Sequence, residues 1–368
     1  MFFLMAKVAQ IGAGMIGRAM AYDLSNDHQV SVGDFNAAAL ESISALAPSI
    51  ATHQFDVQNE NDIRGFIDDA DLVLLAVPGF LGFNALKTII NHGKNVVDIS
   101  FSNENFLDLN ELAIKKGVTA IVDAGLAPGI PNFLLGLHDA QGEIDSFEYY
   151  VGGLPKNPKP PFNYKAPFSP IDVIEEYTRP ARMVVDGKQI TRPALSEIED
   201  MYFEKLGTLE AFNTDGLRSI LITMSHIRNM KEKTLRYAGH AALMANYRNA
   251  GKFDEERIEQ TSNELFDAWR LEEREPEVTI MKIIIQEKSV RIEYNLHDEY
   301  DSKTGFTSMS RTTGFTATAT VNMIAQGLFG DVGVFPPELV GKELRCTDYL
   351  LDYLSQRDIK LDKYVSKL

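Results

Sequence analysis

Cysteine is almost absent from this chain of 368 residues, because Cys346 is the only one. An intrachain disulfide is therefore excluded, and so is a C-x-x-C metal or redox motif. None of the seven histidines stands at ligand spacing to another, and H-E-x-x-H is missing, so we expect no metal site. The motifs S-x-x-K and G-x-S-x-G are missing as well, which leaves acyl-enzyme chemistry without support.

Positive charge is also scarce. The chain has 36 Lys and Arg against 52 Asp and Glu, a formal net charge of −16. Proteins that bind nucleic acid usually carry a basic face, so we expect no nucleic-acid partner. The longest apolar run, Leu72–Phe83, is too short to span a bilayer and contains Pro78, so no membrane segment is expected. The N-terminus lacks the basic region of a signal peptide, and we expect a cytoplasmic protein.

The first 125 residues alternate between predicted strands and predicted helices. This alternation is typical of an α/β fold with a Rossmann-type, doubly wound parallel sheet. Ligands of such a sheet bind outside the carboxyl ends of its strands. The residues that we expect near a cofactor for this reason follow or end the successive strands: Asp34, Asp56, Val77, Pro78, Ser100, Asp123 and Ala124.

The segment "KVAQIGAGMIGRAMAYDL" predicts a strand, a tight turn and a helix. Gly12, Gly14 and Gly17 fit G-x-G-x-x-G: the first permits the turn, the second lets a pyrophosphate approach the backbone, and the third allows close packing of helix and strand. Met15 and Ile16 lie within this turn, where the helix N-terminus offers unpaired N–H groups to an anion. We predict that these five residues bind the cofactor.

Asp34 stands 22 positions after Gly12, at the end of the second predicted strand. A carboxylate there accepts hydrogen bonds from the 2′-OH of the adenosine ribose and repels a 2′-phosphate. The sequence therefore favours NAD over NADP as cofactor. A solvated aspartate at a strand end is the structural alternative.

From about Ser146 the pattern changes to longer strands, the last two of which resemble a hairpin, with helices between them. We expect a second, α+β domain built on a mixed or antiparallel sheet. The segment "RTTGFTATATVNMIAQGLFG" predicts a helix whose small residues suit close packing on the first domain. The predicted domains are 1–127, completed by 312–345, then 128–311, and a C-terminal tail at 346–368.

A proline-rich ribbon, "YVGGLPKNPKPPFNYKAPFSP", holds six of the fifteen prolines and no acidic residue. Its prolines hold an irregular loop in place at low entropic cost. We expect it to present Tyr164, Lys165 and Ser169 toward a small substrate, since ligand sites are commonly clefts at domain interfaces. A surface crossover is the alternative.

Several long motifs in the right order resemble the saccharopine dehydrogenase family, from about Lys7 to Gly341, and within it the lysine 6-dehydrogenases. They are "GAGMIGRA", "VPGFLGF", "VDISF", "DAGLAPGIPN", the ribbon, "SPIDVIEEYTRPARMV", "EAFNTDGLRS", "KTLRYAGH" and "SMSRTTGFTA". The saccharopine reductase branch has an acid at Ala127 and a cysteine at Val151, and it prefers NADP. These departures, with Asp34, point toward the lysine 6-dehydrogenase branch.

The resemblance implies an NAD-dependent oxidative deamination of L-lysine at the ε-carbon to 2-aminoadipate 6-semialdehyde, with release of ammonia. It also implies a homodimer. Hydride loss requires a neutral amine, so a base must lie near C6. Asp123 is the first candidate for this base and Lys165 the second. The residues expected to bind the substrate are Ser100, Tyr164, Asn213, Arg236 and Arg311, with Arg236 the first choice for the α-carboxylate.

Two alternatives remain open. One is another amino-acid dehydrogenase or reductase of the same family, acting on saccharopine-type substrates. The other, of a different class, is an NAD-binding sensor or scaffold without turnover. For each arginine, an ion pair with one of the 52 acids is the structural alternative.

Overall fold

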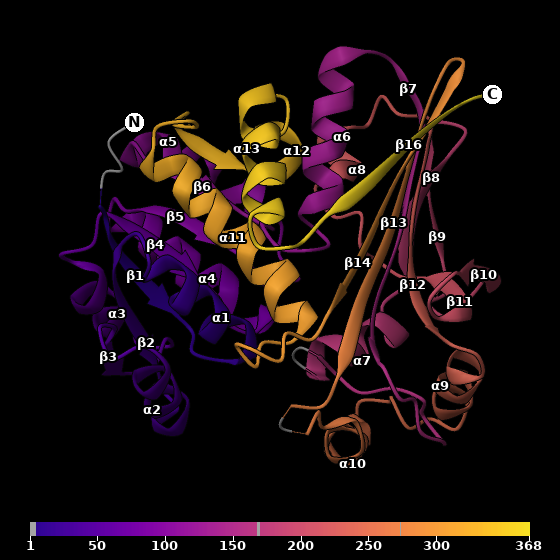
Figure 1. Ribbon diagram of the computed structural model, residues 1–368, viewed down its shortest axis with the longest axis horizontal. Helices are drawn as coiled ribbons and strands as arrows, with labels where there is room; N and C mark the ends of the chain where they lie inside the picture. Colours follow the sequence, from indigo (N-terminus) through magenta and orange to yellow (C-terminus); the bar gives the residue numbers. More distant parts are fainter. Residues whose placement is uncertain (1–4, 168–169, 273) are drawn as a thin grey trace. The chain divides into compact units, whose positions relative to one another are not determined.

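The computed structural model describes residues 5–167, 170–272 and 274–368, which leaves Ser169 outside the described residues. The chain divides into two compact units. The first comprises Met1–Ala140 and Ser310–Asp358, and the second comprises Gln141–Met309 and Ile359–Leu368. The division thus falls at 140 and 309, where the sequence-based boundaries are 127 and 311. Each unit is described below by itself (Figure 1).

A seven-stranded parallel sheet forms the centre of the first unit, with the strand order β15-β6-β5-β4-β1-β2-β3. The order reverses direction between β1 and β4, as in doubly wound folds. The strands are β1 (Lys7–Ile11), β2 (Gln29–Asp34), β3 (Ala51–Gln54), β4 (Leu72–Leu75), β5 (Asn95–Asp98), β6 (Thr119–Ile121) and β15 (Gly333–Phe335).

Helices connect and cover these strands. Those of the first unit are α1 (Met15–Leu24), α2 (Ala37–Leu46), α3 (Glu60–Ile67), α4 (Gly79–Asn91), a 3-10 turn (Phe106–Leu109), α5 (Asn110–Lys116), α12 (Pro337–Val340) and α13 (Leu344–Ser355), with most of α6 (Ile130–Gln141) and α11 (Ser308–Ala325). Apolar residues of α3, α4 and α5 pack against the buried strands in one core. Asn36 and Asn59 accept hydrogen bonds from the first turns of α2 and α3, which fixes where these helices begin.

Helix α11 packs closely on α1, because a Cβ added at Gly314 would lie 3.0 Å from Cγ of Met20. A Cβ at 314 would require the side chain of Met20 to shift. The prediction of a C-terminal helix whose small residues allow close packing on the first domain is therefore confirmed.

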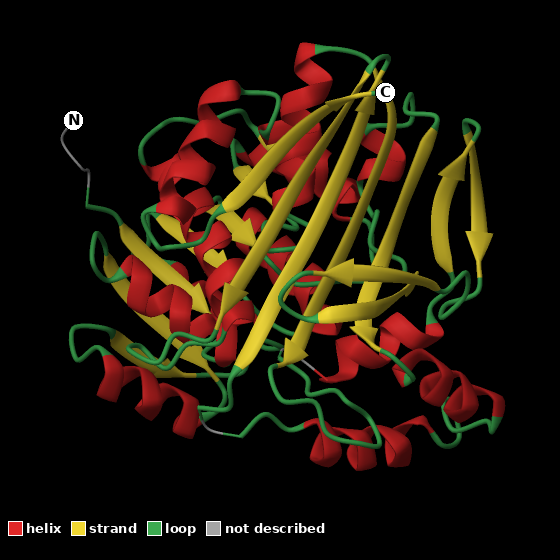
Figure 2. Ribbon diagram, turned by 45° about the vertical axis from the view of Figure 1, so that its right-hand side comes forward, coloured by secondary structure: helices red, strands yellow, loops and turns green. Residues whose placement is uncertain are grey.

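A nine-stranded mixed sheet forms the second unit, with the order β10-β11-β12-β7-β13-β14-β16 and the β8–β9 hairpin beside β12. Only the β12–β7 pair among these is parallel. The long strands lie side by side in Figure 2. The nine strands of this sheet are β7 (Ile144–Pro155), β8 (Ala181–Val185), β9 (Lys188–Arg192), β10 (Glu199–Phe203), β11 (Gly207–Asn213), β12 (Asn229–Tyr237), β13 (Glu277–Glu287), β14 (Val290–Glu299) and β16 (Leu361–Lys367).

The helices α7 (Pro170–Thr178), α8 (Ile220–Thr223), α9 (His240–Asn249) and α10 (Ile258–Trp269) belong to the same unit. The predicted fold class, a Rossmann-type sheet with a second α+β unit on a mixed sheet, is confirmed, and so is the β13–β14 hairpin. Residues 346–368, predicted as a tail, form most of α13 in the first unit and β16 in the second. No helix in the described part of the chain combines the length and apolar character needed to cross a membrane.

Candidate functional site: a dinucleotide-binding edge and a buried polar cluster

The glycine motif forms the turn between β1 and α1. Gly12 has a φ of +113°, and a Cβ there would lie 2.1 Å from the carbonyl oxygen of Ala76, so only glycine fits. A Cβ at Gly17 would lie 2.3 Å from the carbonyl oxygen of Gly12. At Gly14, the N-cap of α1, a Cβ would meet no atom within 4 Å, so the backbone faces open space. This is the arrangement that lets a pyrophosphate reach the N-terminus of the helix.

Gln10 of β1, which was not among the predicted site residues, stabilises this turn. Its side-chain amide donates to the carbonyl oxygens of Gly12 at 2.8 Å and of Gly17 at 2.7 Å. Because Gln10 is fully buried, these bonds are shielded from water. The sequence signal that could have identified Gln10 is a polar residue within an otherwise apolar strand.

Asp34 lies beside the same turn. One carboxylate oxygen accepts from the backbone N–H of Ala13 at 2.7 Å, and the other accepts from that of Asn36 at 2.8 Å. The structure thus brings Asp34 and the glycine motif together, as the sequence predicted from their spacing. Met15 and Ile16 occupy the first two positions of α1, and Met15 is exposed.

The ends of β4 and β5 place the next predicted residues at the same edge of the sheet. Val77 packs against the core, and Pro78 is the exposed N-cap of α4. Ser100 is buried, and its hydroxyl donates to the carboxylate of Asp98 at 2.5 Å. A Cβ at Gly82 would lie 2.1 Å from that hydroxyl, so Ser100 packs directly against α4. Its hydroxyl is engaged within the protein rather than presented to solvent.

Asp123 follows β6 and adopts a φ of +56°, a conformation that non-glycine residues rarely take. It is buried, and the backbone N–H of the next residue, Ala124, donates to the carbonyl oxygen of Asp98 at 3.0 Å. Backbone strain of this kind is concentrated at functional sites. Asp123 therefore remains the candidate base, at the carboxyl end of a parallel strand.

Arg236, predicted to receive a substrate carboxylate, is instead the centre of a buried cluster in the second unit. The residue is only 2% exposed, and its guanidinium forms an ion pair with Glu176 at 2.5 Å. It also donates to the hydroxyl of Tyr177 at 3.3 Å and to the backbone carbonyl of Leu235 at 3.0 Å. All three nitrogens are thus engaged, which disfavours the predicted role because no free fork remains for a second carboxylate.

The same cluster anchors the proline-rich ribbon. Tyr164 is buried, with the Arg236 guanidinium 4.3 Å from the centre of its ring. His240 hydrogen-bonds to the carbonyl oxygen of Phe162 at 2.7 Å and to the hydroxyl of Tyr177 at 2.9 Å. The ammonium of Lys165 donates to the carbonyl of Arg270 at 2.7 Å. The ribbon is therefore held at residues 162, 164 and 165 by contacts with the rest of the second unit.

Burial sets the charge states within this cluster. Desolvation, together with the charge of Arg236, lowers the pKa of His240 to about 3, so this imidazole is neutral. Desolvation also raises the pKa of Glu176, and the Arg236 guanidinium opposes that effect. The cluster holds one fixed positive charge and one carboxylate that stabilises it.

Glu232 is a second buried carboxyl group that sequence reasoning missed. It accepts from the hydroxyl of Thr214 at 2.6 Å and from the backbone N–H of Gly216 at 3.1 Å. Desolvation raises its pKa to about 8. The loop after β11 packs on this group, since a Cβ at Gly216 would lie 2.8 Å from the carboxyl carbon. The sequence signal that could have identified Glu232 is the polar residue at every second position of β12, namely Glu232, Thr234 and Arg236.

Asn213, predicted to bind substrate, is fully buried at the end of β11. Its side-chain amide donates to Ser196 at 3.1 Å and to Glu197 at 3.0 Å. These bonds fix the segment between β9 and β10. The predicted contact of Asn213 with the substrate stays a prediction.

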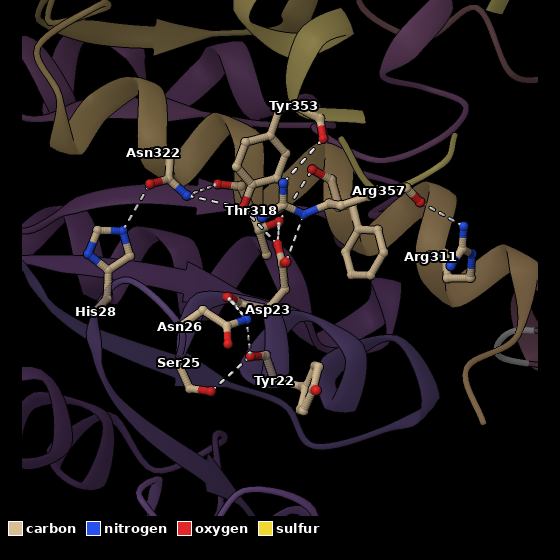
Figure 3. A network of polar contacts seen from close by, with 11 residues as sticks. Tyr22, Asp23, Ser25, Asn26, His28, Arg311, Thr318, Asn322, Tyr353 and Arg357 are labelled. Carbon is tan, nitrogen blue, oxygen red and sulfur yellow. Dashed lines mark hydrogen bonds and ion pairs between the residues drawn. The ribbon is translucent and has the colours of Figure 1, made fainter. Parts of the chain in front are cut away.

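Figure 3 shows the polar network around Asp23, at the end of α1. Its carboxylate accepts from Thr318 of α11 at 2.5 Å, from Tyr353 of α13 at 2.7 Å and from Arg357 at 2.7 Å. Arg311, a predicted substrate ligand, donates to the backbone carbonyl of Arg357 at 2.9 Å. The network joins the helix of the glycine motif to residues that lie 295 to 334 positions later in the chain.

The described residues contain no group of three or more His, Cys, Asp or Glu side chains arranged to bind a metal ion.

Two family models cover nearly the whole chain. Residues 8–121 match the saccharopine dehydrogenase NADP binding domain, and residues 125–359 match the saccharopine dehydrogenase C-terminal domain. The chain belongs to the saccharopine dehydrogenase family. The resemblance to this family, stated from the sequence motifs, is thereby confirmed, and the assignment to its lysine 6-dehydrogenase branch stays a prediction.

Among curated relatives, saccharopine dehydrogenase [NADP(+), L-glutamate-forming] of Schizosaccharomyces pombe is 27% identical over 54% of this chain and 47% of its own. The mitochondrial alpha-aminoadipic semialdehyde synthase of Rattus norvegicus is 24% identical over 68% of this chain and 29% of its own. The match thus spans about half of the first relative and less than a third of the second. The solved apo saccharopine dehydrogenase (L-Glu forming) of Saccharomyces cerevisiae has a TM-score of 0.79 at 18% identity, covering 98% of this chain and 100% of that one. This likeness shows a shared fold.

Proposed function

We propose that this member of the saccharopine dehydrogenase family is an oxidoreductase that acts on a carbon–nitrogen bond with NAD as cofactor. The glycine turn would hold the pyrophosphate, and Asp34 would hold the adenosine ribose. The observation that carries the choice of NAD is the charge around β2. Asp34 ends this strand, and no lysine or arginine occurs from Ala19 to Ile63 to pair with a 2′-phosphate.

This choice differs from the cofactor in the name of the Schizosaccharomyces pombe relative, and one assay tests it. We expect kcat/KM with NAD to exceed that with NADP by at least about 10-fold. Asp34→Asn removes the charge and keeps one acceptor oxygen, so it should narrow the ratio. Equal use of both cofactors by the unmodified protein would refute the assignment.

The substrate that we propose is L-lysine, oxidised at its ε-carbon. Lysine, NAD⁺ and water would give 2-aminoadipate 6-semialdehyde, ammonia, NADH and a proton. When bound, NAD⁺ would supply the hydride acceptor. The chain must supply a group that takes the proton of the ε-ammonium, whose pKa in water is about 10.4. Asp123 is proposed for this task because of its place after β6 and its strained backbone.

Lys165 is the weaker candidate for the base, because its nitrogen is engaged with the backbone carbonyl of Arg270. Arg236 is not proposed to bind the α-carboxylate, since its guanidinium is paired with Glu176. Arg311 stays a candidate for that contact. We also propose that the enzyme is a homodimer.

Saccharopine is the second candidate substrate, and the names of the curated relatives favour it. The panel that separates the candidates contains L-lysine, saccharopine, cadaverine and other amino acids, assayed at alkaline pH for reduced cofactor. We expect L-lysine to be oxidised fastest. Faster turnover of saccharopine would transfer the proposal to that substrate, and binding of NAD without turnover of any amine would indicate a sensor or scaffold.

A further inference from the structure

Strand β16 is the last strand of the mixed sheet in the second unit, and it leads to the C-terminus (Figure 1). One of its edges pairs with β14 along seven residues, from Leu361 opposite Leu296 to Lys367 opposite Val290. No strand in the described part of the chain pairs with its other edge. A free edge of this length is a template for pairing with another strand.

The backbone groups on the free edge can be assigned from one hydrogen bond. The N–H of Leu368 donates to the carbonyl oxygen of Ser289 at 3.0 Å, in register with the pairing of β16 and β14. Successive residues of an antiparallel strand direct their backbone groups to opposite sides. The groups at 362, 364 and 366 therefore face β14, and those at 361, 363, 365 and 367 face the free edge.

The side chains of β16 leave this edge open to a partner. Tyr364 is 59% and Val365 is 63% exposed, on opposite faces of the strand. Lysines on an edge often prevent pairing. The ammonium of Lys363, however, lies 5.3 Å from the centre of the Tyr294 ring on β14. Lys363 thus points toward the neighbouring strand of its own sheet and does not protect the free edge.

The residue pattern of β16 suits pairing with a second copy of itself. Two antiparallel copies related by a two-fold axis can be centred on any one residue, and each pair of opposite residues then shares a face. The register centred on Tyr364 pairs all seven residues, with Val365 opposite Lys363, Leu361 opposite Lys367 and Ser366 opposite Asp362. It sets no like charges opposite each other. The neighbouring registers, centred on 363 or 365, set lysine opposite lysine, which is destabilising.

We propose that the free edge of β16 joins two copies of this chain by antiparallel pairing centred on Tyr364. The N–H and C=O groups at 363 and 365 then bond across the two-fold axis, and the two Tyr364 rings pair on one face of the sheet. The inference rests on the proposed homodimer for its partner and is independent of the proposed reaction. A pair of seven-residue strands is a small interface, so we expect a Kd of about 1–100 μM.

Sedimentation equilibrium of the full chain, at concentrations that bracket this Kd, tests the proposal. The N–H of Val365 faces the free edge, so Val365→Pro removes a donor there and none on the side of β14. Association should weaken at least about 10-fold, because symmetry removes the hydrogen bond at two places. Val365→Thr, the matched control, keeps the N–H and should associate like the unmodified protein. Equal association of Val365→Pro and the unmodified protein would overturn the edge and leave the homodimer standing.

Disulfide cross-linking tests the register itself, and it does so even where the proline variant fails to fold. Tyr364→Cys puts two thiols opposite each other at a non-hydrogen-bonded pair, within the span of a disulfide. The native Cys346 is buried. Oxidation should therefore link two copies of Tyr364→Cys. Ser366→Cys is the matched control, because the register sets it opposite Asp362, and it should stay unlinked.

Absence of the cross-link in Tyr364→Cys, or equal cross-linking of the two cysteine variants, would overturn the register centred on Tyr364. An unmodified protein that stays monomeric at every concentration would overturn the edge and the proposed homodimer together. Neither result bears on the proposed reaction, which the formation of NADH from an amine tests separately.

Discussion

The guanidinium of Arg236 and the carboxylate of Glu176 form an ion pair with 2.5 Å between nitrogen and oxygen, inside the second unit. Arg236 comes from β12 and Glu176 from α7, 60 positions apart in the chain. The arginine is buried, whereas the glutamate side chain is 23% exposed. The pair therefore serves to neutralise a buried positive charge beside the proline-rich ribbon.

Removing the charge of Glu176 should destabilise the protein strongly. Glu176→Gln leaves the guanidinium of Arg236 buried without a counter-charge, and we expect a loss of about 3 kcal/mol in the free energy of unfolding. Urea denaturation measures it. Glu175→Gln is the matched control, since Glu175 lies on the same helix as Glu176, pairs with Arg179 just beyond the helix and is more exposed. Its loss should stay below about 1 kcal/mol, and equal losses in the two variants would contradict this account.

His240 should make stability fall in acid. Its folded pKa of about 3 lies below the usual 6.5, so the unfolded chain binds a proton that the folded protein excludes. The stabilising contribution is complete above pH 6.5 and is lost as the pH falls toward 3, at up to about 1.4 kcal/mol per pH unit. Unfolding free energies at pH 7 and pH 5 should differ less in His240→Gln than in the unmodified protein. An equal difference in His240→Gln and in the unmodified protein would contradict a buried, neutral imidazole at this position.

Glu232 should act in the opposite direction. Its folded pKa of about 8 lies above the ordinary 4.5, so the folded protein keeps a proton that the unfolded chain releases. Stability is therefore lost as the pH rises from 4.5 to 8. Glu232→Gln removes this loss, and its stability relative to the unmodified protein should increase steadily between pH 5 and pH 8.

The control for Glu232 is Glu143→Gln. The hydrogen bond and the charge of Lys288 lower the pKa of Glu143, so its titration lies below this pH range. The effect of Glu143→Gln should be nearly constant from pH 5 to pH 8. A constant effect of Glu232→Gln over the same range would rule out a titrating Glu232.

The network around Asp23 should support the first unit through Tyr353. Tyr353→Phe removes one hydrogen bond to a buried carboxylate, and we expect a loss of about 1.5–3 kcal/mol in unfolding free energy. Tyr349→Phe on the same helix removes only a half-buried bond with Gln326 and should cost less than about 1 kcal/mol. If Tyr353→Phe proved neutral, the hydrogen bond between Tyr353 and Asp23 would contribute nothing net to the stability of the first unit.

The glycine turn, Asp34 and the strand–helix alternation could be predicted from local sequence patterns. The residues that define each pattern are close in sequence, so their spacing determines the geometry. The edge strand β15 could not be predicted, because it has three residues and joins the parallel sheet from position 333, beside β6. Nothing local distinguishes so short an apolar segment from a loop.

The partner of Arg236 could not be predicted for a related reason. The motif "TLRY" indicates an arginine on a strand, but its counter-charge is Glu176 of helix α7, 60 positions away in the chain. Whether an arginine meets a protein carboxylate or a substrate carboxylate depends on tertiary packing, which spacing does not encode. The same holds for Asn213, whose partners Ser196 and Glu197 lie on a neighbouring segment.

The central claim is oxidation of the ε-carbon of free L-lysine with NAD⁺, and the products test it most directly. Ammonia and NADH should be measured together during turnover, with L-lysine and with saccharopine as separate substrates. The account predicts one ammonia for each NADH from L-lysine and little NADH from saccharopine. Release of L-glutamate from saccharopine without ammonia, at a higher kcat/KM than that for L-lysine, would contradict it.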